Sequence, residues 1–255
     1  MNLSTINEMP TYIFTVPSTG KDIKFRPFVH KEEKILQIAK ESEDPKQFLQ
    51  AVKDTIAACT FNAVNVDELA SFDIEELFIL LRAKSVGENL SISLLCKNIV
   101  AGEDGNEDFC NGKNDFDINL EDVKVDRGKL GKKKNNDNII KLNEKVSVEM
   151  KYPSFDTIEA LSGLMNNENV TEENLIDILY SCIHSVFTKD DMFVINKSDR
   201  QEFIAFVDSL TPNQLSRIFA FLKNIPTVEY TIKSKCKTCG KEIKYTFRGI
   251  NDFFG

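Results

Sequence analysis

Two thiols near the end of the chain are the residues best placed to do chemistry. Cys236 and Cys239 lie in the stretch KCKTCGKEIKYTF, Lys235 to Phe247, with two residues between them. This spacing suits half of a tetrahedral metal site or a redox dithiol. Gly240 follows the second cysteine and tolerates the left-handed conformation of a tight turn, so both thiols can point to one spot. The stretch therefore predicts a zinc knuckle that supplies two ligands.

Two further ligands must come from another part of the chain. Cys96 and Cys110 are the candidates, because each lies next to a segment with alternating apolar residues. Cys59 and Cys182 lie on predicted helices, where a small buried hydrophobe is the simpler interpretation. The predicted ligands of a structural zinc ion are Cys96, Cys110, Cys236 and Cys239.

The wide spacing of the first pair leaves alternatives open. A 13-residue insertion with GEDGNED at its centre separates Cys96 from Cys110, whereas a regular ribbon repeats the CxxC motif. A site without metal is one alternative, and a redox dithiol is another. Redox chemistry of the thioredoxin type needs CxxC at the start of a helix, but here a strand follows. Four thiolates leave no position for water, so the expected zinc is structural rather than catalytic.

Four alternating segments position these cysteines. Leu90 to Leu94 and Phe116 to Leu120 predict two strands, joined by a polar loop over residues 97–114. Val228 to Ile232 and Ile243 to Phe247 predict a hairpin around the CxxC motif. We therefore expect a small zinc-ribbon-like β subdomain made from two distant parts of the chain.

The N-terminal part predicts a hairpin followed by helices. Thr11 to Val16 and Asp22 to Arg26 are β-prone runs joined by a Pro-Ser-Thr-Gly turn. Helices are expected after Pro27, after the N-cap Asp44, and from about Asp73, where the acidic pair Glu75–Glu76 would lie in a solvated first turn. Their predicted apolar stripes are Ile35, Ile38 and Ala39; Phe48, Val52 and Ile56; and Leu77, Leu80 and Leu81.

The second half repeats a theme and then becomes helical. Val146 to Leu161 predicts a strand, an aromatic-Pro pair and a helix, as Ile23 to Leu36 does, which indicates either an internal duplication or chance. Three further helices are expected to begin at the caps Thr171, Ser198 and Thr211. The stripe of the first contains Leu175, Ile178, Leu179, Cys182 and Val186.

Composition and missing motifs exclude several functions. The 255 residues are 42% hydrophobic and carry a net charge of −8, so a real core is expected and broad nucleic-acid binding is not. No apolar run is long enough to span a membrane, and the N-terminus lacks a signal peptide, so the expectation is a cytosolic chain. Neither His30 nor His184 belongs to a catalytic motif, and no phosphate-binding loop or nucleophile elbow occurs. We predict that the protein is not an enzyme and has no small-molecule substrate.

The predicted fold class is α+β, with a mostly helical body, an N-terminal β-hairpin and a small zinc-ribbon-like β subdomain. The expected divisions are a strand-Pro-helix unit with helices (1–90), the first half of the β subdomain (91–121), a basic flexible linker (122–141), a second strand-Pro-helix unit with helices (142–226) and the second half of the β subdomain (227–255).

Three stretches resemble a known family. Arg26 to Leu36 reads RPFVHKEEKIL, Phe72 to Glu88 contains RAKSVGE, and Val148 to Leu161 reads VEMKYPSFDTIEAL. Together they are similar to the baseplate hub assembly proteins of T-even-like contractile-tailed bacteriophages. The resemblance covers most of the chain, with RAKSVGE its most specific part.

The resemblance implies a non-catalytic viral tail protein that assembles the baseplate hub, as a hub component or an assembly chaperone. Its partners would be other hub or tape-measure chains, met in the host cytoplasm during assembly or in the virion tail. Arg82, Lys84 and Glu88 are expected to be exposed and to contribute a partner surface; alternatively, the two cations merely favour a helix C-terminus. The rival function is a zinc-ribbon nucleic-acid-binding regulator, based on the lysines Lys129, Lys132, Lys133 and Lys134.

Overall fold

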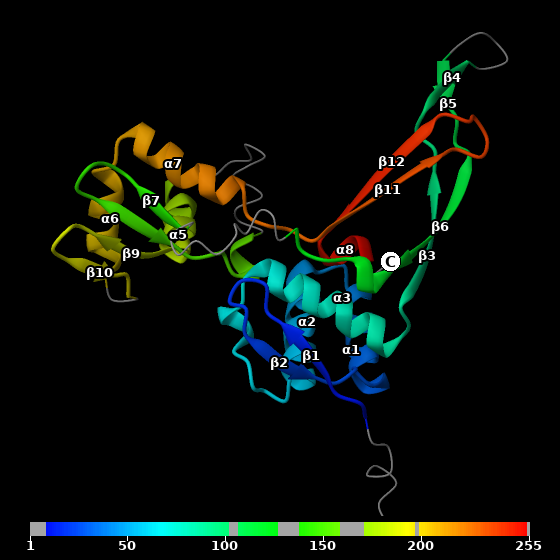
Figure 1. The fold of residues 1–255 in the computed structure, drawn as a ribbon, viewed down its shortest axis with the longest axis horizontal. Helices are drawn as coiled ribbons and strands as arrows, with labels where there is room; N and C mark the ends of the chain where they lie inside the picture. The colour runs from blue at the N-terminus through cyan, green and yellow to red at the C-terminus, as the bar shows by residue number, and fades with distance from the viewer. Residues whose placement is uncertain (1–8, 102–106, 127–137, 159–170, 197–198, 254–255) are drawn as a thin grey trace, which may run out of the picture. The chain divides into compact units, whose positions relative to one another are not determined.

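The computed structural model describes residues 9–101, 107–126, 138–158, 171–196 and 199–253. It divides into two compact units (Figure 1). Unit 1 comprises Met1–Val64, Glu75–Val125 and Thr227–Gly255; unit 2 comprises Asn65–Ile74 and Asp126–Pro226. The mixed α+β class is confirmed by the helices and small antiparallel sheets of both units.

Unit 1 begins with the predicted hairpin and two helices. Strands β1 (Tyr12–Thr15) and β2 (Asp22–Phe25) pair antiparallel, with Tyr12 opposite Phe25. Helices α1 (His30–Glu41) and α2 (Pro45–Cys59) follow. The α2 N-cap is confirmed, because the Asp44 carboxylate accepts the N–H of Lys46 at 2.9 Å. The buried core of this part of the unit contains Phe14, Phe25, Leu36, Val52, Ile56, Leu77, Phe78 and Leu81.

The apolar stripe expected on α1 is partly wrong. Ile35 and Ile38 are 46% and 58% exposed, whereas Leu36 and Ala39 are buried. The reason is the start of the helix, where the Glu32 carboxylate accepts the N–H of Val29 and pairs with Arg26 at 2.6 Å. This anchor turns the face that carries residues 32, 36 and 39 inward. The two isoleucines are thereby left on the solvent side.

Helix α3 (Ser71–Ser85) begins two residues before the predicted start. Asp73 lies inside its first turn, where its carboxylate accepts the N–H of Ala70 at 3.1 Å. The acids that follow are not solvated as expected, because Glu75 and Glu76 are only 9% and 7% exposed. Apolar residues surround this helix on most sides, so its acids must find partners inside the protein.

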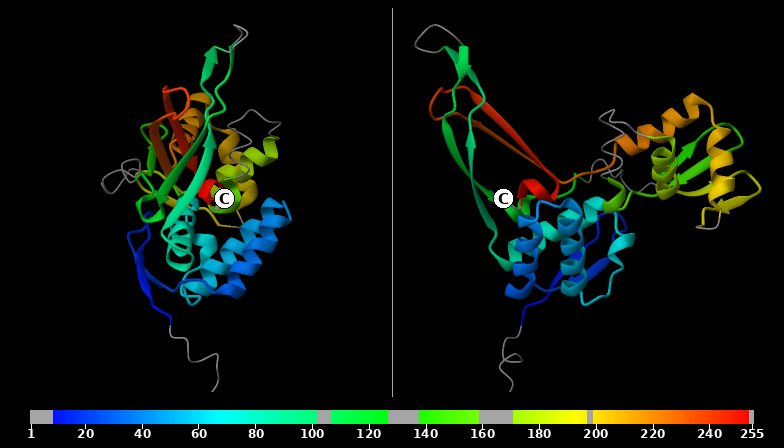
Figure 2. Two further views of the ribbon diagram at one scale, coloured as in Figure 1. Left: turned by 90° about the vertical axis from the view of Figure 1, so that its right-hand side faces the viewer. Right: turned by 180° about the vertical axis from the view of Figure 1, so that it is seen from behind.

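Two β-arms extend from the helices of unit 1 (Figure 2). One pairs β3 (Asn89–Leu95) with β6 (Lys113–Asn119), and the other pairs β11 (Glu229–Lys235) with β12 (Glu242–Arg248). We call them the β3–β6 arm and the β11–β12 arm. The 3-10 helix η3 (Leu120–Asp122) follows β6, and α8 (Gly249–Phe253) follows β12.

The polar loop expected between Cys96 and Cys110 contains a strand pair instead. Strands β4 (Ile99–Ala101) and β5 (Glu107–Phe109) pair antiparallel, with Ile99 opposite Phe109. The N–H of Cys96 donates to Gly112 O at 2.9 Å, and the N–H of Cys110 donates to Asn98 O at 2.8 Å. The antiparallel ladder of β3 and β6 therefore continues past the cysteines. The polar composition of this stretch did not predict these additional strands.

Unit 2 contains a four-stranded antiparallel sheet in the order β10-β9-β8-β7, of which the sequence predicted only the strand β8. Its buried residues include Val148, Met150, Ile178, Leu179, Phe203, Ile218 and Leu222. The strands are β7 (Ile139–Lys141), β8 (Ser147–Met150), β9 (Ile183–Phe187) and β10 (Met192–Val194). The other elements are η2 (Val66–Glu68), α5 (Glu172–Cys182), α6 (Arg200–Asp208) and α7 (Pro212–Lys223).

The end of α5 corrects the predicted helix stripe. His184 and Val186 lie on β9 rather than on the helix, because α5 stops at Cys182 and Val186 pairs with Val148 of β8. Pairing with a distant strand has outweighed the helical spacing. The caps Thr171 and Thr211 are confirmed, each accepting the N–H three residues on. Ser198 lies outside the described residues, and Asp199 is the N-cap of α6.

Several expectations fall on parts that the structure does not describe. The lysines at positions 129–134 are among them, as is the helix after Pro153 beyond residue 158. The five-part division of the chain stays a prediction. In the described part of the chain, no helix combines the length and apolar character needed to cross a bilayer.

Candidate metal centre

The four cysteines predicted as ligands come together in unit 1. Their Sγ atoms all lie within 4.8 Å of one another, at the place where the two β-arms meet. Cys96 and Cys239 are 3.9 Å apart, and Cys110 and Cys236 are 3.7 Å apart. A tetrahedral ion with metal–sulfur bonds of about 2.3 Å requires sulfur atoms about 3.8 Å apart. The arrangement is therefore compatible with a structural metal ion.

The second pair lies on the hairpin turn, as predicted. The N–H of Cys236 donates to Lys241 O and the N–H of Gly240 donates to Cys236 O, both at 2.9 Å. Gly240 has a φ of +73°, in the left-handed region that favours glycine. The turn brings Cys239 back beside Cys236, which gives the knuckle geometry expected from the CxxCG motif.

The first pair is held differently, because it does not lie on a turn. Cys96 follows β3 and Cys110 follows β5, and the two are neighbours across a continuing antiparallel ladder. Asn111 adopts a φ of +51°, and its N–H donates to Cys96 O at 3.0 Å. The 13-residue separation is thus compatible with adjacent thiols, since β4 and β5 pair with each other beyond them.

Gly112 allows the two cysteine-bearing segments to approach. A Cβ atom at this position would lie 2.7 Å from Cβ of Thr238 and 3.2 Å from Sγ of Cys110. The first distance is far inside van der Waals contact, so any larger residue would push the two arms apart. Sequence reasoning missed this glycine, whose requirement arises only from the distant Thr238.

Two asparagines donate to the thiols and were also missed. Nδ2 of Asn114 lies 3.6 Å from Cys236 Sγ, and Nδ2 of Asn98 lies 3.8 Å from Cys239 Sγ. Asn114 is buried and fixed, since its Oδ1 accepts the N–H of Lys237 at 3.0 Å. A signal existed in the sequence: Asn114 occupies an inward position two residues before Phe116, where an apolar residue would be expected. Donors of this kind orient sulfur ligands and stabilise their negative charge.

The surroundings divide the four thiols by acidity. N–H groups of Cys239 and Thr238, with help from Asn114, lower the pKa of Cys236 to about 6. The N–H of Lys241 lowers the pKa of Cys239. Desolvation raises the pKa of Cys96. At Cys110 the N–H of Gly112 acts to lower the pKa, but desolvation and the neighbouring thiols outweigh it and raise the pKa to about 12. Four thiolates at this spacing need a cation between them, because like charges repel strongly.

The other two cysteines are confirmed as buried residues away from the cluster. Burial raises the pKa of both Cys59 and Cys182 to about 12. Each ends a helix and behaves as a small hydrophobe.

Of the three residues predicted to bind a partner, Glu88 is exposed as expected, whereas Arg82 and Lys84 are less exposed than expected. Arg82 is half-buried, and desolvation lowers its pKa. Lys84 pairs with Glu88 at 2.9 Å and also with Glu121. These pairs join α3 to the segment after β6, which gives Lys84 and Glu88 an intramolecular role. Their contribution to a partner surface stays a prediction.

Two buried carboxylates hold the other end of the β-arms. Oε2 of Glu75 accepts the N–H of Val228 at 3.2 Å, just before β11, and Oε2 of Glu76 accepts the N–H of Val125 at 2.9 Å. Val125 and Val228 also form an isolated antiparallel bridge. Desolvation raises the pKa of Glu75 to about 7, against the lowering effect of the Val228 N–H. Both acids therefore attach the bases of the arms to α3.

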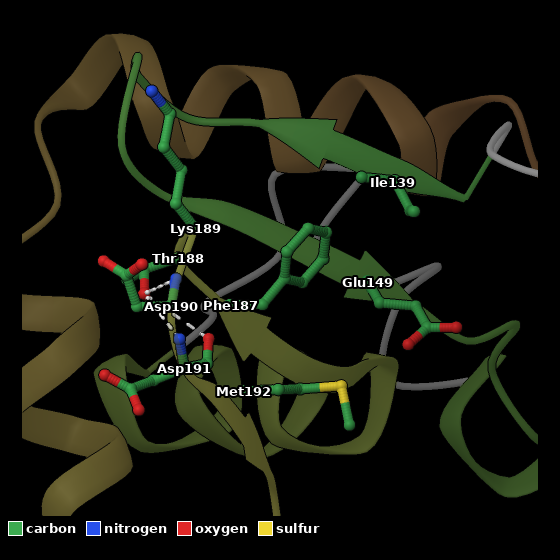
Figure 3. Close-up of a pocket in the computed structure, with 8 residues that line it drawn as sticks. All are labelled: Ile139, Glu149, Phe187, Thr188, Lys189, Asp190, Asp191 and Met192. Atoms are coloured by element: carbon green, nitrogen blue, oxygen red, sulfur yellow. Dashed lines mark hydrogen bonds between the residues drawn. The ribbon is translucent and has the colours of Figure 1, made fainter.

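A shallow hollow in unit 2 lies over the β7–β10 sheet (Figure 3). Ile139, Glu149, Phe187 and Met192 line it, together with the turn at residues 188–191. Two backbone N–H groups of the turn are used locally, since Thr188 Oγ1 accepts those of Asp190 and Asp191 at 3.3 and 3.1 Å. The carboxylates of Glu149, Asp190 and Asp191 point in different directions (Figure 3), so they do not converge as groups that position a substrate would.

Within the described ranges, the best-formed site is therefore a closed cluster of four thiols, which is typical of structural rather than catalytic metal centres. Residues 9–255 match the family model described as T4 bacteriophage base plate protein, so the chain belongs to this family. It is thus a phage baseplate protein, with a structural or assembly role in the virion tail. No curated protein and no solved structure matches the chain.

Proposed function

We propose that this protein assembles the baseplate hub through contacts with other hub or tape-measure chains, either as a hub component or as an assembly chaperone. Cys96, Cys110, Cys236 and Cys239 hold a structural zinc ion in this proposal. The observation that carries it is the near-tetrahedral spacing of four thiols in a chain of the baseplate family. No catalytic step is proposed.

Zinc would join two arms that otherwise share a small apolar contact and a few hydrogen bonds. The cluster at the meeting point contains Cys96, Cys236 and Ile243, with Phe116 and Tyr245 packed against it. This core is too small to hold two hairpins together by burial alone, which is the usual reason for a structural metal in a small β element. The bound ion would supply the missing cross-link between arms that are far apart in sequence.

Elemental analysis of protein purified without added metal tests the zinc proposal. We expect about one zinc ion per chain, because four thiolates form one closed site. Cys236→Ser should lose the metal and lower the melting temperature. Cys59→Ala is the matched control, since it removes a buried thiol outside the cluster and should retain the zinc. Absence of zinc, with an unchanged melting temperature in Cys236→Ser, would contradict the proposal.

Quantitative mass spectrometry tests the hub proposal. The chain is measured in completed particles and in unassembled tail intermediates from the same infected lysate. A fixed small copy number in particles would identify a hub component, whereas enrichment in intermediates alone would identify an assembly chaperone. Absence from both would overturn the hub role and favour the nucleic-acid-binding alternative.

Arg82 is the best remaining candidate for a partner contact, because among the described residues its half-buried guanidinium forms no ion pair, unlike Lys84 and Glu88. Arg82→Glu should reduce co-purification of the hub chain that the mass spectrometry identifies. Lys46→Glu is the control, as it makes the same change of charge at an exposed position on α2. Equal co-purification of the two variants would remove Arg82 from the partner surface.

A further inference from the structure

The outer faces of the two β-arms carry opposite charges. In the β3–β6 arm, Phe116 points into the cluster between the arms, so Asp115 and Asp117 on either side of it point outward. In the β11–β12 arm, Ile243 and Tyr245 point inward, so Lys244 between them points outward. The two outer faces therefore lie on opposite sides of the joined arms.

The acidic face is well formed. It contains Ser91, Ser93, Asp115 and Asp117, all of which are exposed, and the exposed Lys113 lies at its end, two residues before Asp115. The Ser91 hydroxyl donates to Asp117 at 2.6 Å, and the Ser93 hydroxyl donates to Asp115. These bonds fix the two carboxylates at neighbouring same-face positions of β6, about 7 Å apart by strand geometry.

The basic face is unusual in an acidic chain. It contains Lys233, Lys235 and Lys244, with Glu242 directly opposite Lys235, and all four residues are exposed. Lys233 lies directly opposite Lys244 in the ladder, a like-charge pair that destabilises a sheet. No ion pair neutralises Lys233 or Lys244 among the residues that the structure describes. Six basic and two acidic residues occur between Glu229 and Arg248, although the whole chain carries a net charge of −8.

We propose that the basic face of one copy of this chain docks on the acidic face of a second copy. Charge complementarity supports a second copy of the chain as the partner. Each copy carries the basic face on one side of the joined arms and the acidic face on the other side. The spacing also agrees, since Lys233 and Lys235 are two residues apart on one strand, as Asp115 and Asp117 are. The contact uses different faces of the two copies, so it is head-to-tail and generates a ring or a filament.

Sedimentation velocity of the full-length, metal-bound chain tests this. The chain is measured over a range of concentrations at about 0.01 M and about 1 M salt, where the Debye length is about 30 Å and about 3 Å. We expect the mass to rise with concentration at low salt and to be that of a monomer at high salt. A wild-type chain that stays monomeric at low salt would overturn the proposal, even if it were retained on DNA or on an acidic protein.

Two variants then identify the faces. Lys233→Glu/Lys244→Glu should abolish self-association and so should Asp115→Lys/Asp117→Lys, because each destroys one face. Lys46→Glu/Lys145→Glu changes the charge equally at exposed positions elsewhere and should leave association intact. Circular dichroism and zinc content identical to those of the wild type check folding. Asp115→Asn/Asp117→Asn is the milder variant if the lysines disturb the strand.

Mixing the two variants gives the sharpest result. The lysine variant retains its acidic face, the aspartate variant retains its basic face, and the two reversed faces are again complementary in charge, so an equimolar mixture should regain association that neither variant shows alone. If the mixture stays monomeric, or if either variant alone still associates, the head-to-tail contact is wrong. The proposal goes beyond the hub role, and its failure would leave both the zinc content and the copy number in particles unchanged.

Discussion

The two ends of the β-arms are held by different chemistry. At the tip, four Sγ atoms within 4.8 Å of one another belong to segments up to 143 residues apart, and a cation would be needed to neutralise them. At the base, the buried acids Glu75 and Glu76 accept the N–H groups of Val228 and Val125. We therefore expect loss of a thiol ligand or of a bound metal to separate the arms at the tip. At the base, we expect the stability of the contacts to depend on pH.

Removing a tip ligand should have the largest effect. Cys236→Ser, or a strong chelator on the wild type, should abolish amide protection in β4, β5 and the β11–β12 turn while α3 keeps its protection. The reason is that zinc binding supplies about 10–16 kcal/mol in small metal-dependent domains. Hydrogen exchange followed by mass spectrometry measures this. Equal loss of protection at the base would show that the two ends are not independent.

Blocking the approach of the arms should have the next largest effect. Gly112→Ala places a Cβ 2.7 Å from Cβ of Thr238, so zinc affinity should fall by about 10- to 100-fold, as when other supporting groups of a metal site are changed. Competition with a chromophoric chelator measures the affinity. Adding Thr238→Gly removes the opposing atom and should restore binding; a double variant as weak as the single one would exclude the steric explanation.

The base should give stability a pH dependence through Glu75. Its folded pKa of about 7 exceeds the ordinary value of 4.5, so between these values the folded chain retains a proton that the unfolded chain has lost. The contribution of Glu75 is therefore favourable below about pH 4.5, declines as the pH rises to about 7, and is constant above it. Glu75→Gln keeps an acceptor for Val228 and should raise the free energy of unfolding at pH 8 by up to about 3 kcal/mol. Denaturant titrations at both ends of this range measure it; identical pH slopes in the variant and the wild type would refute it.

The smallest effect is expected at the second base contact. Glu76→Ala leaves the buried N–H of Val125 without its acceptor, which costs about 1–3 kcal/mol. Glu76→Gln preserves the acceptor and is the matched control. Both variants should retain full zinc content, because the change lies at the end of the arms remote from the thiols. A loss of zinc in Glu76→Ala would show that the base positions the tip.

Local signals predicted much of what positions the candidate site. The caps Asp44, Thr171 and Thr211 begin helices as expected, and the CxxCG motif lies on a turn that Gly240 permits. Each of these depends on residues within four positions in the chain, so the sequence contains the complete interaction. Pairing Cys96 with Cys110 also succeeded, since both adjoined alternating strands.

Long-range contacts account for what local patterns missed. The end of α5 was wrong because Val186 pairs with Val148, and the solvated first turn of α3 was wrong because Glu75 and Glu76 accept N–H groups from distant strands. In these two cases a partner remote in sequence outweighed the local periodicity. The inward face of α1 was shifted instead by a nearer contact, the ion pair of Arg26 with Glu32 at the start of the helix.

The sequence by itself determined the residue types of the thiol cluster, the turn at its second pair, the mixed fold class and the resemblance to baseplate proteins. These follow from composition, short spacings and neighbouring residues. Only the tertiary structure decided that Gly112 must lack a side chain, that Asn114 faces Cys236, and that the two arms carry acidic and basic outer faces. The physical reason is that each of these features depends on which distant segments face one another, and that is set by packing of the folded chain rather than by any single stretch.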